Sequence, residues 1–116
     1  MRRWFLGTPL PPALADEGHA VVAFLRGAAP DEEKADRAFR FIYATGEMAL
    51  AYHFHQPLVK LGVGKVTRAA VDVATSVALA GMRGPMRRVL LGMTAEQLRG
   101  VADEIEFRLY PDPHTE

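Results

Sequence analysis

The stretch AYHFHQP, residues 51 to 57, is where side chains that could do chemistry crowd together. Histidine is the commonest metal ligand in proteins and a frequent general base. On a strand His53 and His55 would share a face, whereas on a helix two residues span about 200° and place them on opposite sides. A shared metal ion would then need His19 or an acid from another helix. We favour a helix end, where a histidine in the last turn meets free backbone carbonyls.

Other catalytic patterns are incomplete. The segment GVGKVT, residues 62 to 67, contains a Gly-Lys pair, but Val59 and Val66 stand where a phosphate-binding loop needs glycine and a hydroxyl residue. The chain has no cysteine, and Ser76, its single serine, lies in a run of alanine and valine. Thiol chemistry is therefore excluded and a serine triad is disfavoured. We expect no cofactor, no bound metal and a non-enzymatic function.

The acidic side chains leave one enzymatic alternative open. Glu47 lies two turns after Arg40 in an otherwise apolar stretch, and a buried carboxylate with a partner there would be a mark of function. We favour instead a solvent-facing side chain or an ion pair with Arg40 or with an arginine of another helix. The acids of residues 31 to 36 and 101 to 107 suggest a metal-dependent hydrolase as a second alternative. Acids in a first helical turn are, however, ordinary partners of the helix dipole.

The elements that must position these residues are helices. Alanine is frequent, and apolar residues recur at spacings of three and four with little strand-like alternation. A length of 116 residues with 49% hydrophobic and 24% charged residues suits one domain with one core. We therefore predict an all-α, single-domain bundle of about four helices over residues 1–116. Residues 1–10 form an N-terminal arm and residues 111–116 a C-terminal tail.

Prolines and glycines mark the first two helices. The first runs from Pro11 to Arg26, before Gly27, and its buried stripe is expected to contain Leu14, Val21, Val22 and Leu25. The second begins after Pro30 with three acids. It ends near His55, because Pro57 disfavours helical geometry in the residue before it.

The remaining helices follow the same signals. The third begins at or shortly after Pro57 and ends near Met82, and a connection with a short fifth helical turn follows Pro85. The last helix begins at a Thr94–Gln97 capping box and ends at Pro111. Its buried stripe is expected to contain Leu98, Val101, Ile105 and Leu109.

Apolar faces indicate association with other helices. The second helix is apolar nearly all round between residues 38 and 54, so either it is the central helix or a second subunit covers part of it. We predict a homo-oligomer. The expected contact residues are Phe39, Phe41, Tyr43, Tyr52, Phe54 and Trp4. In the third helix, spacings of four and three predict a seam packed on another helix, made of Val59, Val63, Val66, Ala70, Val73, Val77 and Ala80. Its opposite stripe, Lys65, Arg68, Asp72 and Ser76, is expected to face water.

Charge suggests a runner-up function. Residues 57–100 carry seven basic and two acidic side chains, whereas residues 101–116 carry one basic and five acidic ones. A small nucleic-acid-associated regulator would use the basic segment 83–88 and neighbouring cations, namely Lys65, Arg68, Arg83, Arg87 and Arg88. We favour it less, because the last helix is acidic and the basic and acidic segments could meet each other within or between subunits.

The chain also carries signals on location. Prolines 9, 11 and 12 interrupt any signal-peptide core, and AAVDVATSVALAGM is too short and too interrupted by Asp72 to cross a bilayer. The lack of cysteine agrees with a reducing compartment. We therefore expect a cytoplasmic module without a membrane segment, whose partner is a second copy and a further protein that the sequence does not name.

Overall fold

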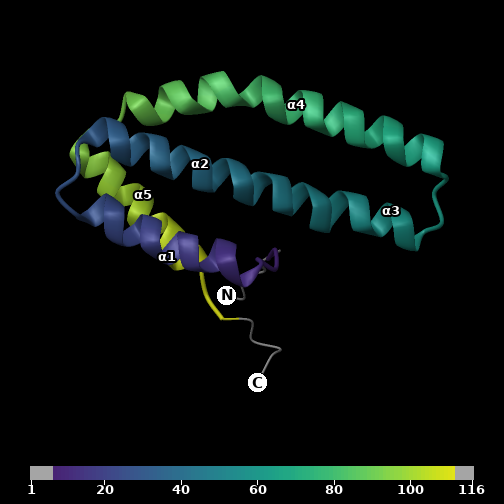
Figure 1. Ribbon diagram of the computed structural model, residues 1–116, viewed down its shortest axis with the longest axis horizontal. Helices are drawn as coiled ribbons and strands as arrows, with labels where there is room; N and C mark the ends of the chain where they lie inside the picture. The colour runs from purple at the N-terminus through teal and green to yellow at the C-terminus, as the bar shows by residue number, and fades with distance from the viewer. Residues whose placement is uncertain (1–6, 112–116) are drawn as a thin grey trace, which may run out of the picture.

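The all-α fold is confirmed by the computed structural model, which describes residues 7–111 (Figure 1). Its elements in chain order are α1 (Pro12–Arg26), α2 (Asp31–Leu50), a π-helical turn η1 (Ala51–His55), α3 (Gln56–Lys60), α4 (Lys65–Leu91) and α5 (Ala95–Arg108). Residues 7–111 contain no strand.

The helix ends that local chemistry predicts are found in the structure. Pro12 occupies the first turn of α1, which ends at Gly27. At α5 the Thr94 hydroxyl accepts a hydrogen bond from the Gln97 amide at 3.2 Å, and the Gln97 side chain accepts one from the Thr94 amide at 2.9 Å. This is the predicted capping box.

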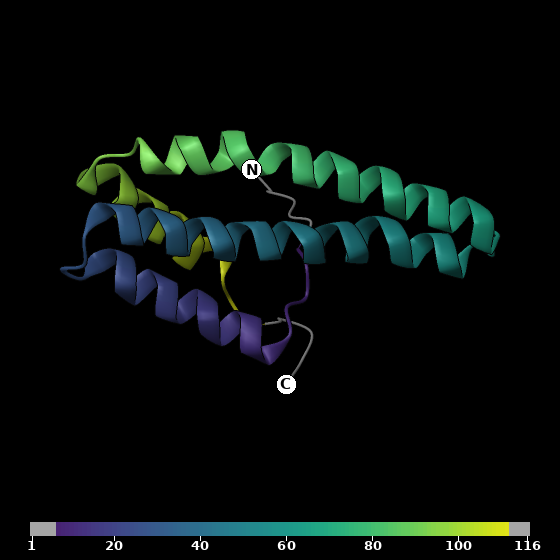
Figure 2. The ribbon, with the colours of Figure 1, turned by 45° about the horizontal axis from the view of Figure 1, so that its top comes forward.

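The prediction that the second helix ends before Pro57 is wrong. The elements α2, η1 and α3 form one continuous rod (Figure 2). In η1 the amide of Gln56 bonds to the carbonyl of Ala51, five residues back. A proline has no amide hydrogen and its ring collides with the carbonyl four residues earlier, and the wide π turn just before Pro57 relieves this conflict. The rod ends at Lys60, and Gly62 in the turn that follows has a φ of 74°, which suits glycine best.

The predicted break near Met82 is also absent. The helix α4 runs for 27 residues with Pro85 inside it, so the residues expected to form a separate fifth turn continue the same helix. An interior proline costs about 3 kcal/mol. Leu90 beyond it is buried and Met86 packs partly buried against the core, and fully burying one such side chain stabilises by roughly 1.5–3 kcal/mol. Packing on the core therefore offsets the local penalty.

The core lies at one end of the molecule, where α1, the first half of α2, the end of α4 and α5 meet. Its buried apolar members are Val21, Val22, Leu25, Ala35, Ala38, Phe39, Phe41, Leu90, Leu98 and Ala102. Leu14, Val101 and Ile105 pack against this core, as their stripes predict. Lys34 is buried too, and its ammonium donates to the carbonyl of Gly27 at the end of α1.

The other end of the molecule is a two-helix hairpin. There the rod of α2, η1 and α3 lies beside α4 only, beyond the reach of α1 and α5 (Figures 1 and 2). The radius of gyration is 16.3 Å, compared with about 13 Å for a compact chain of this length. In residues 7–111 no helix is long and apolar enough to cross a membrane.

Candidate functional site: the helical hairpin and its outer face

The two histidines lie within the rod and face opposite ways. The Nε2 atom of His53 is 2.8 Å from the Thr8 hydroxyl, on the side of the N-terminal segment. His55 faces α4, where its Nδ1 atom is 2.5 Å from a carboxylate oxygen of Asp72. The opposite orientation agrees with the helical argument, but the predicted helix end does not: the rod continues to Lys60, so these side chains do not cap its last carbonyls. Within the described part of the chain, no three His, Asp or Glu side chains are grouped to hold a metal.

A polar cluster ties the hairpin together at His55. Besides Asp72, the ring contacts Thr75, whose hydroxyl is 3.2 Å from Nε2. The arrangement of hydroxyl, imidazole and carboxylate is that of a nucleophile with its base and orienting acid. The Thr75 hydroxyl, however, also donates within its own helix to the carbonyls of Val71 at 3.0 Å and Asp72 at 3.1 Å. Its proton therefore has acceptors other than the imidazole, and the cluster acts as a structural clasp.

A hollow of about 310 Å³ adjoins this clasp. Arg68 lines it, and its Nε atom is buried without a hydrogen-bond partner among the described residues. The full lining is His55, Leu58, Val59, Lys65, Arg68, Ala69 and Asp72. Polar groups and a hollow thus lie inside the hairpin, where a helix pair ordinarily packs large apolar side chains.

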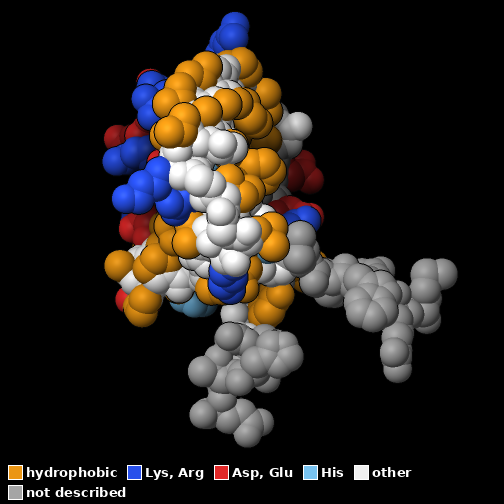
Figure 3. Space-filling model, turned by 90° about the vertical axis from the view of Figure 1, so that its right-hand side faces the viewer, with side chains coloured by type: hydrophobic (Ala, Val, Ile, Leu, Met, Phe, Trp, Pro, Cys, Tyr) orange, Lys and Arg blue, Asp and Glu red, His pale blue; other side chains and the backbone are white. Residues whose placement is uncertain are grey.

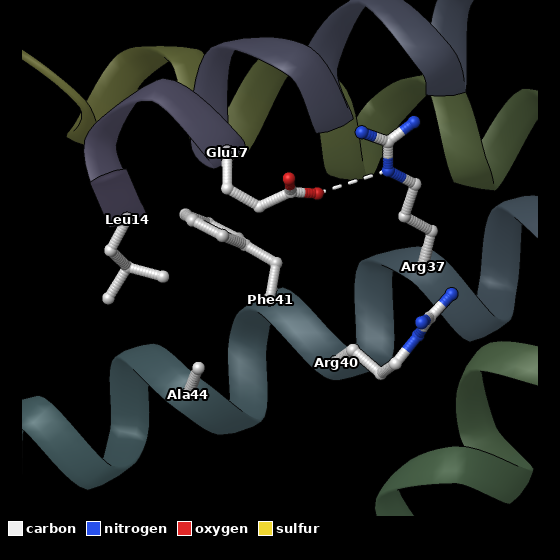
Figure 4. Close-up of a pocket in the computed structure, with 6 residues that line it drawn as sticks. All are labelled: Leu14, Glu17, Arg37, Arg40, Phe41 and Ala44. Atoms are coloured by element: carbon white, nitrogen blue, oxygen red, sulfur yellow. Dashed lines mark hydrogen bonds and ion pairs between the residues drawn. The ribbon is translucent and has the colours of Figure 1, made fainter. Parts of the chain in front are cut away.

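A second hollow, of about 370 Å³, lies between α1 and α2 (Figure 4). Glu17 and Arg37 point toward each other across it, and the Arg37 Nε atom donates to the Glu17 carboxylate at 3.1 Å. The guanidinium of Arg37 also lies over the Phe24 ring at 4.8 Å. Because each charge already has a partner, this hollow is explained by the packing of the two helices.

The predicted acid Glu47 is exposed, as its solvent-facing alternative expects. Its expected partner is wrong, because Arg40 pairs with Asp36 at 3.1 Å. Asp36 also receives Arg87 of α4 at 3.5 Å. Glu47 is therefore not a buried carboxylate within the single chain.

The basic residues proposed for nucleic acid are divided and partly engaged. The guanidinium of Arg83 lies over the Tyr43 ring at 4.8 Å, and Arg87 pairs with Asp36. Arg88 and Lys65 are exposed, but Lys65 and Arg68 begin α4 while the arginines of segment 83–88 lie near its end. Arg68 and Arg83 are 15 residues apart, which is roughly 22 Å along the helix.

The basic middle and the acidic C-terminal segment do not meet in an ion pair among residues 7–111. The acids of α5 bind elsewhere: Asp103 and Glu106 pair with Arg26 of α1 at 2.7 and 2.8 Å. Glu104 pairs with Arg108 of its own helix. For the acids among residues 101–111, pairing of the two segments would have to occur between subunits.

The predicted contact aromatics have different environments. Phe39 and Phe41 are each 7% exposed in the core, so their assignment as contact residues is wrong. The reason is that α1, α4 and α5 already cover the first half of α2. Tyr43 is half-buried beneath Arg83, and Trp4 lies outside residues 7–111. Tyr52 and Phe54 are 40% and 49% exposed on the hairpin, so they are accessible to contact with another subunit or protein.

The valine seam of α4 points outward, which reverses the predicted orientation of this helix. Val66, Val73 and Val77 are 86%, 64% and 67% exposed. In the stripe expected to face water, Lys65, Asp72 and Ser76 are exposed as predicted, whereas Arg68 is half-buried. Arg68 and Asp72 line the hollow beside His55. Leu79 approaches α2, where its Cδ1 atom would lie 3.9 Å from a Cβ on Gly46. The predicted seam with another helix is thus not made inside one chain.

We call this outward surface the α4 face. It consists of Val66, Ala70, Val73, Val77, Ala80 and Gly84, all exposed. Between Val66 and Gly84 the charged residues of α4 are Arg68, Asp72 and Arg83, and all three contact the inner side of the hairpin or Tyr43. The face is therefore uncharged over 19 residues, or roughly 28 Å. Seen from the hairpin tip, hydrophobic side chains form much of the surface while Lys and Arg lie mainly along one side (Figure 3).

No protein-family model, curated protein or solved structure matches this chain. Its function has to be argued from the surfaces described above.

Proposed function

We propose that the chain is a non-enzymatic, homo-oligomeric interaction module, in which two copies join through the α4 face. The observation that carries this proposal is the uncharged, exposed seam of valine, alanine and glycine on α4. A continuous exposed apolar surface of this length is unusual for a monomer and marks an interaction site. The spacing of four and three along the face is that of helices packed at a shallow angle.

A second copy suits the face better than a charged partner does. A two-fold contact places the same patch on both sides, so the patch must be complementary to itself. An uncharged face of small residues meets this condition without like-charge repulsion. Tyr52 and Phe54 would then remain on the hairpin for a further protein, which is the adaptor role.

The other two functions have less support. Segment 83–88 retains Arg88 as its free cation among the described contacts, because Arg83 and Arg87 are engaged. A metal-dependent hydrolase would need a grouped set of acidic ligands, and the acids of α5 are instead paired with arginines.

The test is the mass of the protein in solution. Light scattering at micromolar concentration should give twice the chain mass of 12.8 kDa. Val73→Glu and Val77→Glu should each give the monomer mass, because each buries an unpaired charge in the contact. Both positions are exposed in the single chain, so neither charge is buried within it, and circular dichroism should show that the four-helix end stays helical.

Ala78→Glu is the matched control, since it adds the same charge to an exposed position of α4 that lies about 100° round the helix from Val77, away from the face. It should stay dimeric. A monomeric wild type, or a Val73→Glu variant that remains dimeric, would refute the proposal.

A further inference from the structure

We infer that the two copies of α4 pack antiparallel, about a two-fold axis that crosses the helix at the level of Thr75. This inference rests on the proposed function and adds the direction and register of the contact. It follows from the order of side-chain sizes along the α4 face, from the charge at the end of α4, and from the spacing of the seam.

The first argument is the order of side-chain sizes along the α4 face. It begins with Val66 and ends with Gly84, and in chain order its members are valine, alanine, valine, valine, alanine and glycine. In an antiparallel pair, Val66 meets Gly84 of the second copy, and Ala70 meets Ala80. The two end layers then hold similar side-chain volumes, and Val73 meets Val77 in the middle.

A parallel pair would distribute the same volume unevenly. Valine would meet valine at the hairpin tip, and Gly84 would meet Gly84 at the other end. The helix axes would have to converge toward Gly84 or leave a void there, and voids at packed contacts are destabilising. The antiparallel register avoids this mismatch along the whole face.

The second argument is charge. Arg83, Arg87 and Arg88 lie within the last ten residues of α4, and Arg88 follows Gly84 by one helical turn on the same side. A parallel pair would bring both arginine clusters together. In an antiparallel pair they lie near opposite ends of a helix of 27 residues, several times farther apart than the Debye length of about 8 Å. Each cluster then lies near Lys65 and Arg68 at the beginning of the other α4, which are also basic, so charge favours the antiparallel pair only weakly.

The third argument is spacing. Successive members of the α4 face are four, three, four, three and four residues apart, the pattern of two helices crossing at about 20° with knobs fitting into holes. The alanines and the glycine allow the two backbones to approach closely. The contact would extend over roughly 27 Å of each helix.

The chain itself offers a clean test, because it has no cysteine. Ala70 and Ala80 are both exposed and ten residues apart, or about 15 Å along one helix, which is too far for a disulfide within a chain. We would make Ala70→Cys, Ala80→Cys and the double variant, oxidise each mildly and separate the products on a non-reducing gel. Glu96→Cys, exposed on α5, measures the background of random collisions.

Antiparallel packing predicts that the double variant forms covalent dimers as its main product. An equimolar mixture of the two single variants, left to exchange subunits before oxidation, should form covalent dimers as well. Each single variant alone should stay at the background of Glu96→Cys, because its cysteines lie about 15 Å apart along the helix direction. Circular dichroism and light scattering of each reduced variant verify that it is folded and dimeric.

These experiments distinguish dimer formation from the direction and register of the contact. Covalent dimers from Ala70→Cys alone would show parallel packing and overturn the inference while leaving the proposed function intact. A dimeric double variant that stays at background would likewise overturn the register. A monomeric wild type in light scattering would overturn the proposed function and the inference together.

Discussion

Gly18 of α1 is the position where a single methyl group tests the packing of the four-helix end most directly. It is buried, and a Cβ built on it would lie 2.8 Å from the Leu109 Cδ2 atom and 2.9 Å from the Phe41 Cζ atom. Glycine inside a helix is destabilising by about 1 kcal/mol relative to alanine. Gly18→Ala gains this amount, but overpacking a core typically costs 1–3 kcal/mol. Phe41 is itself buried and cannot move freely, so we expect a net loss of about 1 kcal/mol.

The matched control is Gly100→Ala in α5, where a Cβ meets nothing within 4 Å. It should stabilise by about 1 kcal/mol through helix propensity alone. Urea titration followed by circular dichroism at one fixed protein concentration measures both, and the two midpoints should move in opposite directions. Equal stabilisation by both substitutions would show that the Leu109 and Phe41 side chains can move to admit a methyl group. It would refute close packing of α1 against α2 and the end of α5 at Gly18.

Two further predictions concern charge. The hydrogen bond from Arg26 lowers the pKa of Glu106 below its usual 4.5, so the stability from this pair is present above that pH and lost as pH falls through the lowered value. In melting curves the difference between wild type and Arg26→Gln should therefore shrink below pH 4.5, and an unchanged difference would refute the link. Replacing Arg83, Arg87 and Arg88 by alanine should remove no nucleic-acid binding in filter assays at physiological salt, since the wild type should show none. Tight wild-type binding whose salt dependence flattens by about one unit per arginine removed would favour the regulator instead.

Local signals in the sequence are sufficient for the helices whose ends depend on neighbouring residues. Pro12 and Gly27 bound α1, and the reciprocal bonds of Thr94 and Gln97 begin α5. The same local reasoning fails at Pro57 and Pro85. At Pro57 a π turn absorbs the conflict, and at Pro85 the burial of Leu90 five residues later decides the outcome. The burial of Leu90 depends on contacts with other helices, which the residues around Pro85 do not specify.

The orientation of α4 could not be predicted for a related reason. Its periodic seam shows that one side is apolar, but periodicity does not state which helix covers that side. The inner side is selected by contacts between distant residues, chiefly His55 with Asp72 and Leu79 near Gly46. The aromatic Phe39 and Phe41 pose the same problem, since an apolar side chain looks alike in a sequence whether its partner is in the same chain or in another.

The hairpin has an unusual distribution of polarity, and this distribution links the fold to the proposed dimer. Inside it lie the clasp of His55, Asp72 and Thr75 and a hollow, while valines lie outside. A lone two-helix hairpin with this arrangement buries little apolar surface and gains little from the hydrophobic effect. A second copy on the α4 face would supply the missing apolar burial. The proposal therefore implies that this half of the molecule gains stability with protein concentration, because association favours the folded state by mass action.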